Sequence, residues 1–195
     1  MTTPQYDEDA ASPAVRKPGR EIRYDAVAAV IAALVGMLAL VVAGYTAYIQ
    51  RQQVRAQVWP YLMMADSDNS SEFMWFNKGV GPAQVKTVQA FVDGKPQRNW
   101  ADVFRSMRLE NLNYGQSTLN GDVLSAGEKL DWLQFKEHGD FQRFREAAHQ
   151  MKLDFKVCYC STLGDCWTND STKGWNDRQA VRACPRLPES GQFDD

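Results

Sequence analysis

The four cysteines are the residues whose type and spacing come closest to a chemical motif. Three lie in one short stretch, KVCYCSTLGDCW at residues 156–167, and the fourth is Cys184. Such a cluster can hold a metal ion, exchange disulfides or form structural cross-links. Four-cysteine metal sites usually contain C-x2–4-C pairs, and thioredoxin-type centres use C-x-x-C. This chain has C-x-C followed by two single cysteines, so its even cysteine count favours structural disulfides.

Alternation along LDFKVCYC, residues 153–160, indicates which cysteines pair. The apolar side chains of one face are Leu153, Phe155, Val157 and Tyr159, so Cys158 and Cys160 share the opposite face of the strand. A turn over residues 161–165 would set Cys160 opposite Cys166, at a separation that a disulfide can span. Cys158 is then left for Cys184. We predict the disulfides Cys160–Cys166 and Cys158–Cys184.

Outside the cysteines, the chain carries no catalytic motif. Its two histidines, His138 and His149, lie in no H-E-x-x-H pattern, and neither G-x-S-x-G, S-x-x-K nor G-K-[ST] occurs. A net charge of −2 gives no basic face for nucleic acid. We therefore expect no catalytic residue, cofactor, metal or nucleic-acid partner, and do not expect an enzyme. The alternative is an anchored envelope thiol, redox or metal-binding protein that uses the cluster Cys158, Cys160, Cys166 and Cys184.

A long apolar run predicts a membrane helix at residues 24–50. No charge interrupts residues 26–50, and about 20 apolar helical residues cross a bilayer. The run is too long for the apolar region of a cleaved signal peptide. Lys and Arg are more numerous in residues 16–23 than after the run, where Arg51 and Arg55 lie. The positive-inside rule therefore predicts a cytoplasmic N-terminus and a single pass.

Small residues recur along this predicted membrane helix. Ala28, Ala32 and Gly36 are spaced four residues apart, a pattern that lets two helix backbones approach closely. The stripe is a candidate face for self-association within the lipid bilayer.

The remaining chain divides into a tail, a helical extension and a β-rich domain. Residues 1–23 have three prolines and mixed charge, which predicts a disordered cytoplasmic tail. Residues 51–58 extend the helix until Trp59-Pro60, and residues 59–195 form the domain. Six or seven short strands are expected there, with helices near 99–112, capped by Asn99, and 139–152, capped by Asp140. The fold class is mainly β, a membrane helix followed by an antiparallel β-sandwich with one or two short inserted helices.

Two motifs carry a family resemblance. The loop NKGVGPA, residues 77–83, precedes a strand and the turn Asp93-Gly94, and LSAGE occupies residues 124–128. Together they resemble the N-x-G-x-G-x-A and L-x-x-G-E/S signatures of bacterial immunoglobulin-like adhesion and scaffold modules. With VWPYL after a single membrane helix and the C-x-C…C-W ending, the chain resembles bacterial single-span membrane proteins with an extracytoplasmic immunoglobulin-like domain.

The resemblance implies a place and a role, but brings no catalytic residues. It implies the bacterial inner membrane, a periplasmic C-terminal domain and a binding or scaffolding role within an envelope complex, with a protein partner. Asn77, Gly79, Gly81 and Pro82 are expected to form a structural loop. The glycines would supply positive φ angles there, and the proline would fix the exit of the chain.

Overall fold

The computed structural model describes residues 24–174, 177–188 and 191–194. The chain forms two compact units, Met1–Tyr48 and Ile49–Asp195. The expected cytoplasmic tail at residues 1–23 lies outside the described residues.

Helix α1 (Tyr24–Gln57) contains the predicted membrane segment. It has 34 residues, none of them buried within the chain, and its most apolar window has a mean hydropathy of 2.8. Its length and composition are therefore sufficient to cross a bilayer. Ala28, Ala32 and Gly36 lie along it, exposed within this chain. The helix ends just before Trp59-Pro60, as expected from the restriction that proline places on the preceding residue.

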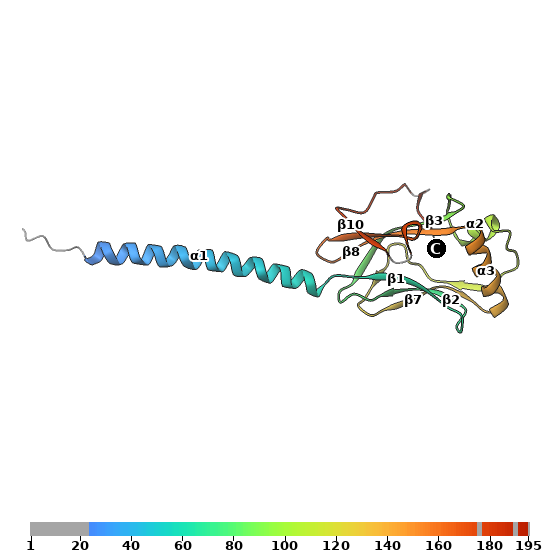
Figure 1. Cartoon of the computed structure of the whole chain (residues 1–195), viewed down its shortest axis with the longest axis horizontal. Helices are drawn as coiled ribbons and strands as arrows, with labels where there is room; N and C mark the ends of the chain where they lie inside the picture. The colour runs from blue at the N-terminus through green and yellow to red at the C-terminus, as the bar shows by residue number, and fades with distance from the viewer. Residues whose placement is uncertain (1–23, 175–176, 189–190, 195) are drawn as a thin grey trace, which may run out of the picture. The chain divides into compact units, whose positions relative to one another are not determined.

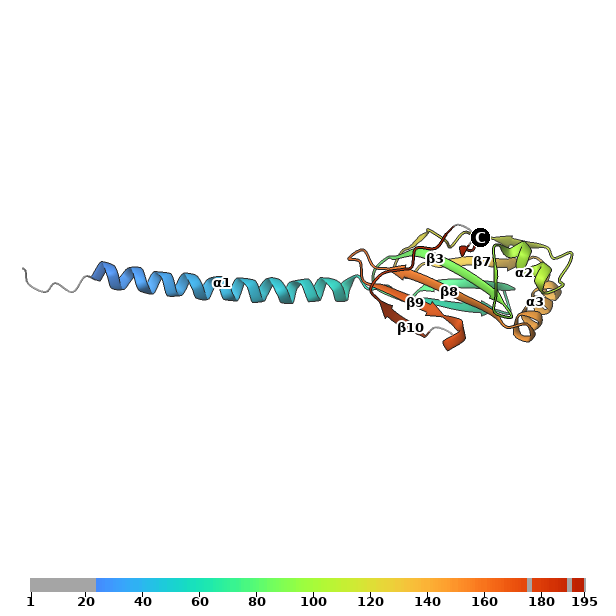
Figure 2. The same cartoon turned by 90° about the horizontal axis from the view of Figure 1, so that it is seen from above.

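The second unit is a β-rich domain of two open antiparallel sheets (Figures 1 and 2). The first sheet has the order β1-β2-β7-β5, formed by β1 (Leu62–Ser67), β2 (Glu72–Asn77), β7 (Lys129–Phe135) and β5 (Tyr114–Gln116). The second has the order β10-β9-β8-β3-β4, with β6 also paired to β3. Its strands are β10 (Arg178–Val181), β9 (Cys166–Asp170), β8 (Leu153–Cys160), β3 (Ala83–Val92), β4 (Lys95–Gln97) and β6 (Val123–Leu124).

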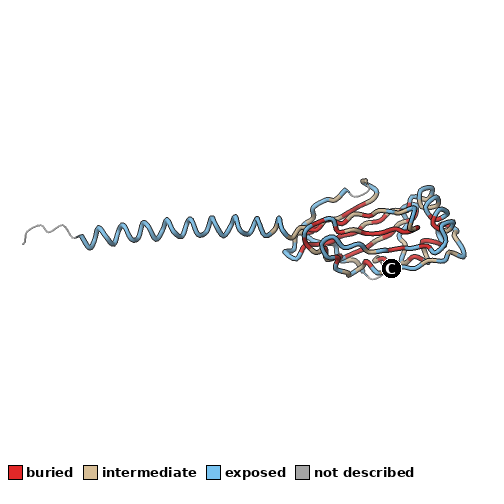
Figure 3. Tube along the Cα trace, turned by 90° about the horizontal axis from the view of Figure 1, so that it is seen from below, coloured by how far each residue is buried: buried red, intermediate tan, exposed pale blue. Residues whose placement is uncertain are grey.

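The hydrophobic core draws on the facing sides of both sheets (Figure 3). Strand β8 alternates as predicted, because Leu153, Phe155, Val157 and Tyr159 all belong to the core. Trp132 is fully buried, with the rings of Trp75 and Trp100 edge-on to it at centroid distances of 5.9 and 4.7 Å. Such edge-to-face pairs add to the stabilisation from area burial.

Helices α2 (Trp100–Ser106) and α3 (His138–Gln150) close one end of the domain. Asn99 caps α2 as expected, since its side-chain oxygen accepts a hydrogen bond from the Asp102 N–H at 2.9 Å. The prediction that Asp140 caps the second helix is wrong. That helix starts at His138, so Asp140 lies in its first turn, where it accepts from the Asn113 N–H and pairs with Arg143. A carboxylate is favourable at either position because both are near the positive end of the helix dipole.

The strands on either side of residues 125–127, β6 and β7, belong to different sheets. β6 pairs with β3, whereas β7 pairs with β2 and β5. The turn between them therefore passes from one sheet to the other. Strands β4, β5 and β10 were not expected; with four residues or fewer each, they are too short to show alternation.

The segment after β10 completes the core. Phe193 is fully buried, its N–H donates to the Val88 carbonyl at 2.8 Å, and its ring lies 5.2 Å from that of Trp100. No pattern in the sequence indicates that this segment inserts a side chain between the sheets.

Candidate functional site

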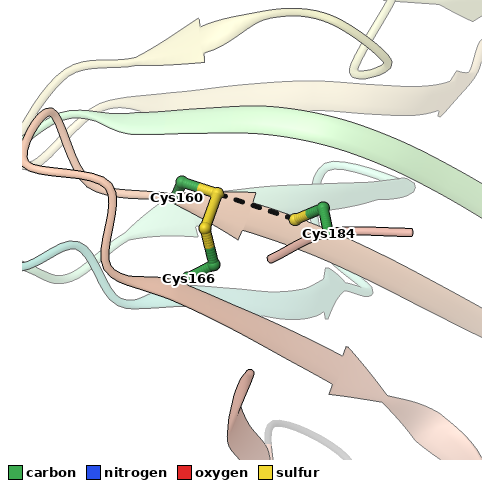
Figure 4. A group of neighbouring side chains, drawn as sticks. All are labelled: Cys160, Cys166 and Cys184. Atoms are coloured by element: carbon green, nitrogen blue, oxygen red, sulfur yellow. Dashed lines mark hydrogen bonds between the residues drawn. A yellow bond between two sulfur atoms is a disulfide. The ribbon is translucent and has the colours of Figure 1, made fainter. Parts of the chain in front are cut away.

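The cysteines form the two disulfides expected from strand alternation, Cys158–Cys184 and Cys160–Cys166. Cys160 and Cys166 are direct partners in the β8–β9 register. The Cys184 sulfur lies 3.7 Å from that of Cys160 (Figure 4), and one ligand atom from each of Cys160, Cys166 and Cys184 fits within 4.8 Å. No cysteine is free. Since thiolates are the metal ligands and nucleophiles, metal binding or exchange at this cluster requires prior reduction.

Both disulfides lie on the face of the second sheet that points away from the core. Cys158 and Cys160 lie outside the core cluster, yet both are buried, at 1% and 7% exposure. Cys158–Cys184 ties the segment after β10 to β8, and Cys160–Cys166 closes the β8–β9 turn. Cys158–Cys184 therefore tethers to β8 the segment that leads to Phe193.

Asn77 organises the loop that follows β2. Its side-chain oxygen accepts hydrogen bonds from the N–H groups of Tyr61 and Gly79, at 3.1 and 3.0 Å. Its side-chain nitrogen donates to the carbonyls of Gly81 and Leu124, at 2.7 and 3.0 Å. The buried amide thus has every donor and acceptor site used, which a buried polar group requires. It joins the loop to β6 and to residues 58–61, which we call the strap.

The glycines of this loop serve close packing and not positive φ angles. Neither Gly79 nor Gly81 has a positive φ, which corrects the sequence prediction. A Cβ on Gly79 would lie 2.5 Å from the Trp59 carbonyl oxygen, and one on Gly81 would lie 2.2 Å from that of Val58. The strap backbone therefore occupies the space that side chains at positions 79 and 81 would need. The Val80 N–H also donates a hydrogen bond to the Trp59 carbonyl, at 3.1 Å.

Arg178 on the edge strand β10 holds the other side of the strap. Its guanidinium lies 4.4 Å from the ring centroid of Trp59, 4.6 Å from Tyr61 and 5.5 Å from Trp167. It also donates to the Pro60 carbonyl at 3.0 Å. Cation–π contacts of this kind are strongest where water is partly excluded. Burial raises the pKa of Tyr159 beneath this cluster, although the Leu62 N–H and Arg178 act in the opposite direction.

A groove of about 570 Å³ opens beside α3, at the end of the domain away from the strap. Its apolar lining comes from both sheets and both helices: Met64, Phe73, Trp100, Phe144, Leu153 and Phe155. Its polar rim consists of Asp66, Arg145, His149, Lys152, Asp154, Ser171 and Thr172. A concave, mainly apolar surface with a few polar groups at its edge is the usual form of a binding site.

The rim contains both paired and unpaired polar side chains. Arg145 pairs with Asp66 at 3.4 Å and Asp68 at 3.1 Å, which ties α3 to β1 and to the β1–β2 turn. Asp154 accepts from the Ser171 hydroxyl at 2.8 Å. Lys152 and His149 are exposed and make no ion pair or hydrogen bond within the described part of the chain. These two side chains are therefore available to a ligand.

The two histidines have different surroundings. His138 Nδ1 lies 3.0 Å from the Ser71 hydroxyl, and its ring stacks near Phe141. His149 stands on the groove rim. Sequence reasoning did not find the groove, because its residues come from widely separated segments and share no motif.

Comparison of the chain with known proteins found no match among family models, curated proteins or solved structures.

Proposed function

We propose that this chain is a single-pass membrane protein of the bacterial envelope that displays a binding or scaffolding domain outside the cytoplasm. The groove beside α3 is the observation that carries the proposal, because it offers an apolar floor and unpaired polar groups at its rim. In this proposal the groove receives a protein partner.

Three further features support an extracytoplasmic location. Helix α1 is long and apolar enough to span a membrane. The domain carries two disulfides, which persist mainly in oxidising compartments such as the periplasm. The excess of basic residues before the span favours a cytoplasmic N-terminus.

The two antiparallel sheets around one core are compatible with an immunoglobulin-like sandwich, which we propose as the fold family.

Topology is tested with green fluorescent protein, which becomes fluorescent in the bacterial cytoplasm but not when exported unfolded to the periplasm. A fusion at the N-terminus should fluoresce and one at the C-terminus should stay dark. A bright C-terminal fusion would show that the domain is cytoplasmic and would overturn the proposed location.

The groove is tested with a matched pair of glycine substitutions. Lys152 on the rim and Arg108 outside the groove both have positive φ angles, 44° and 57°. Glycine fits such a backbone, so Lys152→Gly and Arg108→Gly each remove a cation without a conformational penalty. Proteins cross-linked to the full-length chain in its native membrane should be lost with Lys152→Gly and with the groove-filling Ala148→Phe, but kept with Arg108→Gly. Retention by all three variants would exclude the groove as the contact.

A further inference from the structure

The exposed apolar side chains of the domain are few and belong to separate segments. Within the described residues beyond α1, the large apolar side chains that are exposed are Val80, Val123 and Leu163, at 58%, 51% and 45%. Val80 lies in the loop before β3, Val123 begins β6, and Leu163 lies in the β8–β9 turn. Single exposed apolar residues are normal on protein surfaces. These three residues are informative only because they lie at the same end of the domain.

Strand register places all three at the strap end. Gln84, near the start of β3, pairs with Val123 on one side and with Cys160 on the other. Val80 precedes that start by a short loop, and Leu163 follows Cys160 in the next turn. The same loop packs against the strap, through Gly79 and Trp59. The exposed apolar residues therefore gather where the chain enters the domain.

The length of chain between the apolar run and the strap limits how far this end can lie from a bilayer. The nine steps from Gln50 to Trp59 cover about 14 Å as a helix. A bilayer's polar layer is about 5–8 Å thick on each side of the hydrocarbon. With α1 across the membrane and Gln50 at the edge of the hydrocarbon, the strap end would lie at most about 6–9 Å beyond the polar layer.

The basic side chains near this end suit such a surface, while Asp122 and Asp165 lie close to Val123 and Leu163. Arg51 and Lys78 are exposed, and Arg55 makes a long, exposed ion pair with Asp165, at 3.7 Å. Lys and Arg next to a membrane are attracted to anionic headgroups, and apolar side chains insert at the headgroup boundary.

We propose that the strap end of the domain rests on the lipid surface, with Val80, Val123 and Leu163 inserted among the headgroups. This inference rests on the proposed function in one respect, that α1 spans the membrane. The contact would restrict the tilt of the domain, and so would control how its groove is presented.

Two tryptophan reporters in the full-length chain test the contact. Leu163→Trp places an indole at the strap end, and Lys95→Trp places one beside the Asp93-Gly94 turn at the opposite end of β3. Both sites are exposed. The chain is reconstituted into phosphatidylcholine–phosphatidylglycerol vesicles with plain or brominated acyl chains, and the wild-type emission is subtracted. Leu163→Trp should show a blue shift and lose intensity with brominated lipid, whereas Lys95→Trp should show neither.

Each outcome has a distinct meaning. Equal quenching of the two reporters would overturn the lipid contact while leaving the span intact. A blue shift at Leu163→Trp that disappears when the protein is diluted in lipid would assign the surface to a second copy, and would also overturn it. If alkaline carbonate strips the wild-type chain from the vesicles, the span itself fails, and this inference fails with it.

Discussion

Gly81 and Val58 are in direct backbone contact: a Cβ on Gly81 would lie 2.2 Å from the Val58 carbonyl oxygen and 2.4 Å from its Cα. Because the obstacle is main chain, neither residue can yield by changing a rotamer. The loop after β2 and the strap therefore form one packed unit, which joins the domain to the end of α1.

Gly81→Ala should destabilise the domain by about 1–3 kcal/mol or more, the usual cost of overpacking. The measurement is urea unfolding of the detergent-solubilised protein, followed by tryptophan fluorescence. Gly115→Ala is the matched control, because nothing lies within 4 Å of a Cβ at Gly115. Equal midpoints for the two variants would show that the strap can separate from the loop at little cost.

The two disulfides should contribute unequally to stability. Cys158–Cys184 spans 26 residues and Cys160–Cys166 spans 6. The chain-entropy model assigns about 3.5 kcal/mol to the larger loop and about 2.2 kcal/mol to the smaller. Paired alanine substitutions, Cys158→Ala with Cys184→Ala and Cys160→Ala with Cys166→Ala, should therefore lower the unfolding free energy in that order.

Non-reducing peptide mapping provides the check on this comparison. A peptide that joins Cys158 to Cys166 would contradict the pairing on which both estimates depend. A reversed order of stabilities would instead mean that the closing of the β8–β9 turn matters more than tethering the terminal segment.

Asp170 should make the domain sensitive to acid. Burial raises the pKa of its carboxyl, but the Thr172 hydroxyl at 2.7 Å and Lys156 at 3.0 Å outweigh this effect and lower the pKa. Because the folded-state pKa lies below the unfolded value of about 3.9, the unfolded chain takes up the proton first. The stabilisation is complete above pH values near 4 and is lost as the pH falls through the folded-state pKa.

Asp170→Asn should therefore cost about 1–3 kcal/mol at pH 7, with a deficit that shrinks towards low pH. Unfolding free energies measured from pH 7 down to 3 give this difference. Asp93→Asn is a suitable control, since Asp93 is exposed and forms no ion pair among the described residues. A deficit for Asp170→Asn that stays constant with pH would contradict the ionic origin.

Arg178 should not be replaceable by lysine. Its planar guanidinium lies over Trp59 and Tyr61 while it donates to the Pro60 carbonyl. An ammonium cannot stack in this way, so Arg178→Lys should cost about 1–2 kcal/mol. Arg182→Lys, on an exposed neighbour, should be neutral. Protease cleavage within residues 51–61 should also become faster in Arg178→Lys but not in Arg182→Lys. Equal cleavage rates in the two variants would argue that Arg178 does not hold the strap in place.

Features that depend on local periodicity could be predicted from the sequence. The alternation of β8 identified its core face and, through that face, the cysteine partners. Asn99 was recognisable as a cap because its side chain bonds only three residues ahead. In each case the deciding contact lies within one element or between adjacent strands.

Features that depend on distant segments could not be predicted. Strand β6 pairs with β3 and accepts a hydrogen bond from the Asn77 side chain, 47 residues away in sequence. Gly79 and Gly81 were correctly marked as structural, but the backbone that requires them comes from the strap. The groove combines residues of β1, β2, α2, α3 and β8, and no spacing along the chain records that arrangement.

Phe193 has a consequence for biosynthesis. A polypeptide exported from its N-terminal end delivers this side chain after every strand of both sheets has crossed. Until then the space against Trp100 and Trp132 remains open, and Cys184 has only just become available to Cys158. With the topology proposed above, the domain would complete its core only after translocation, when Phe193 reaches Trp100 and Trp132.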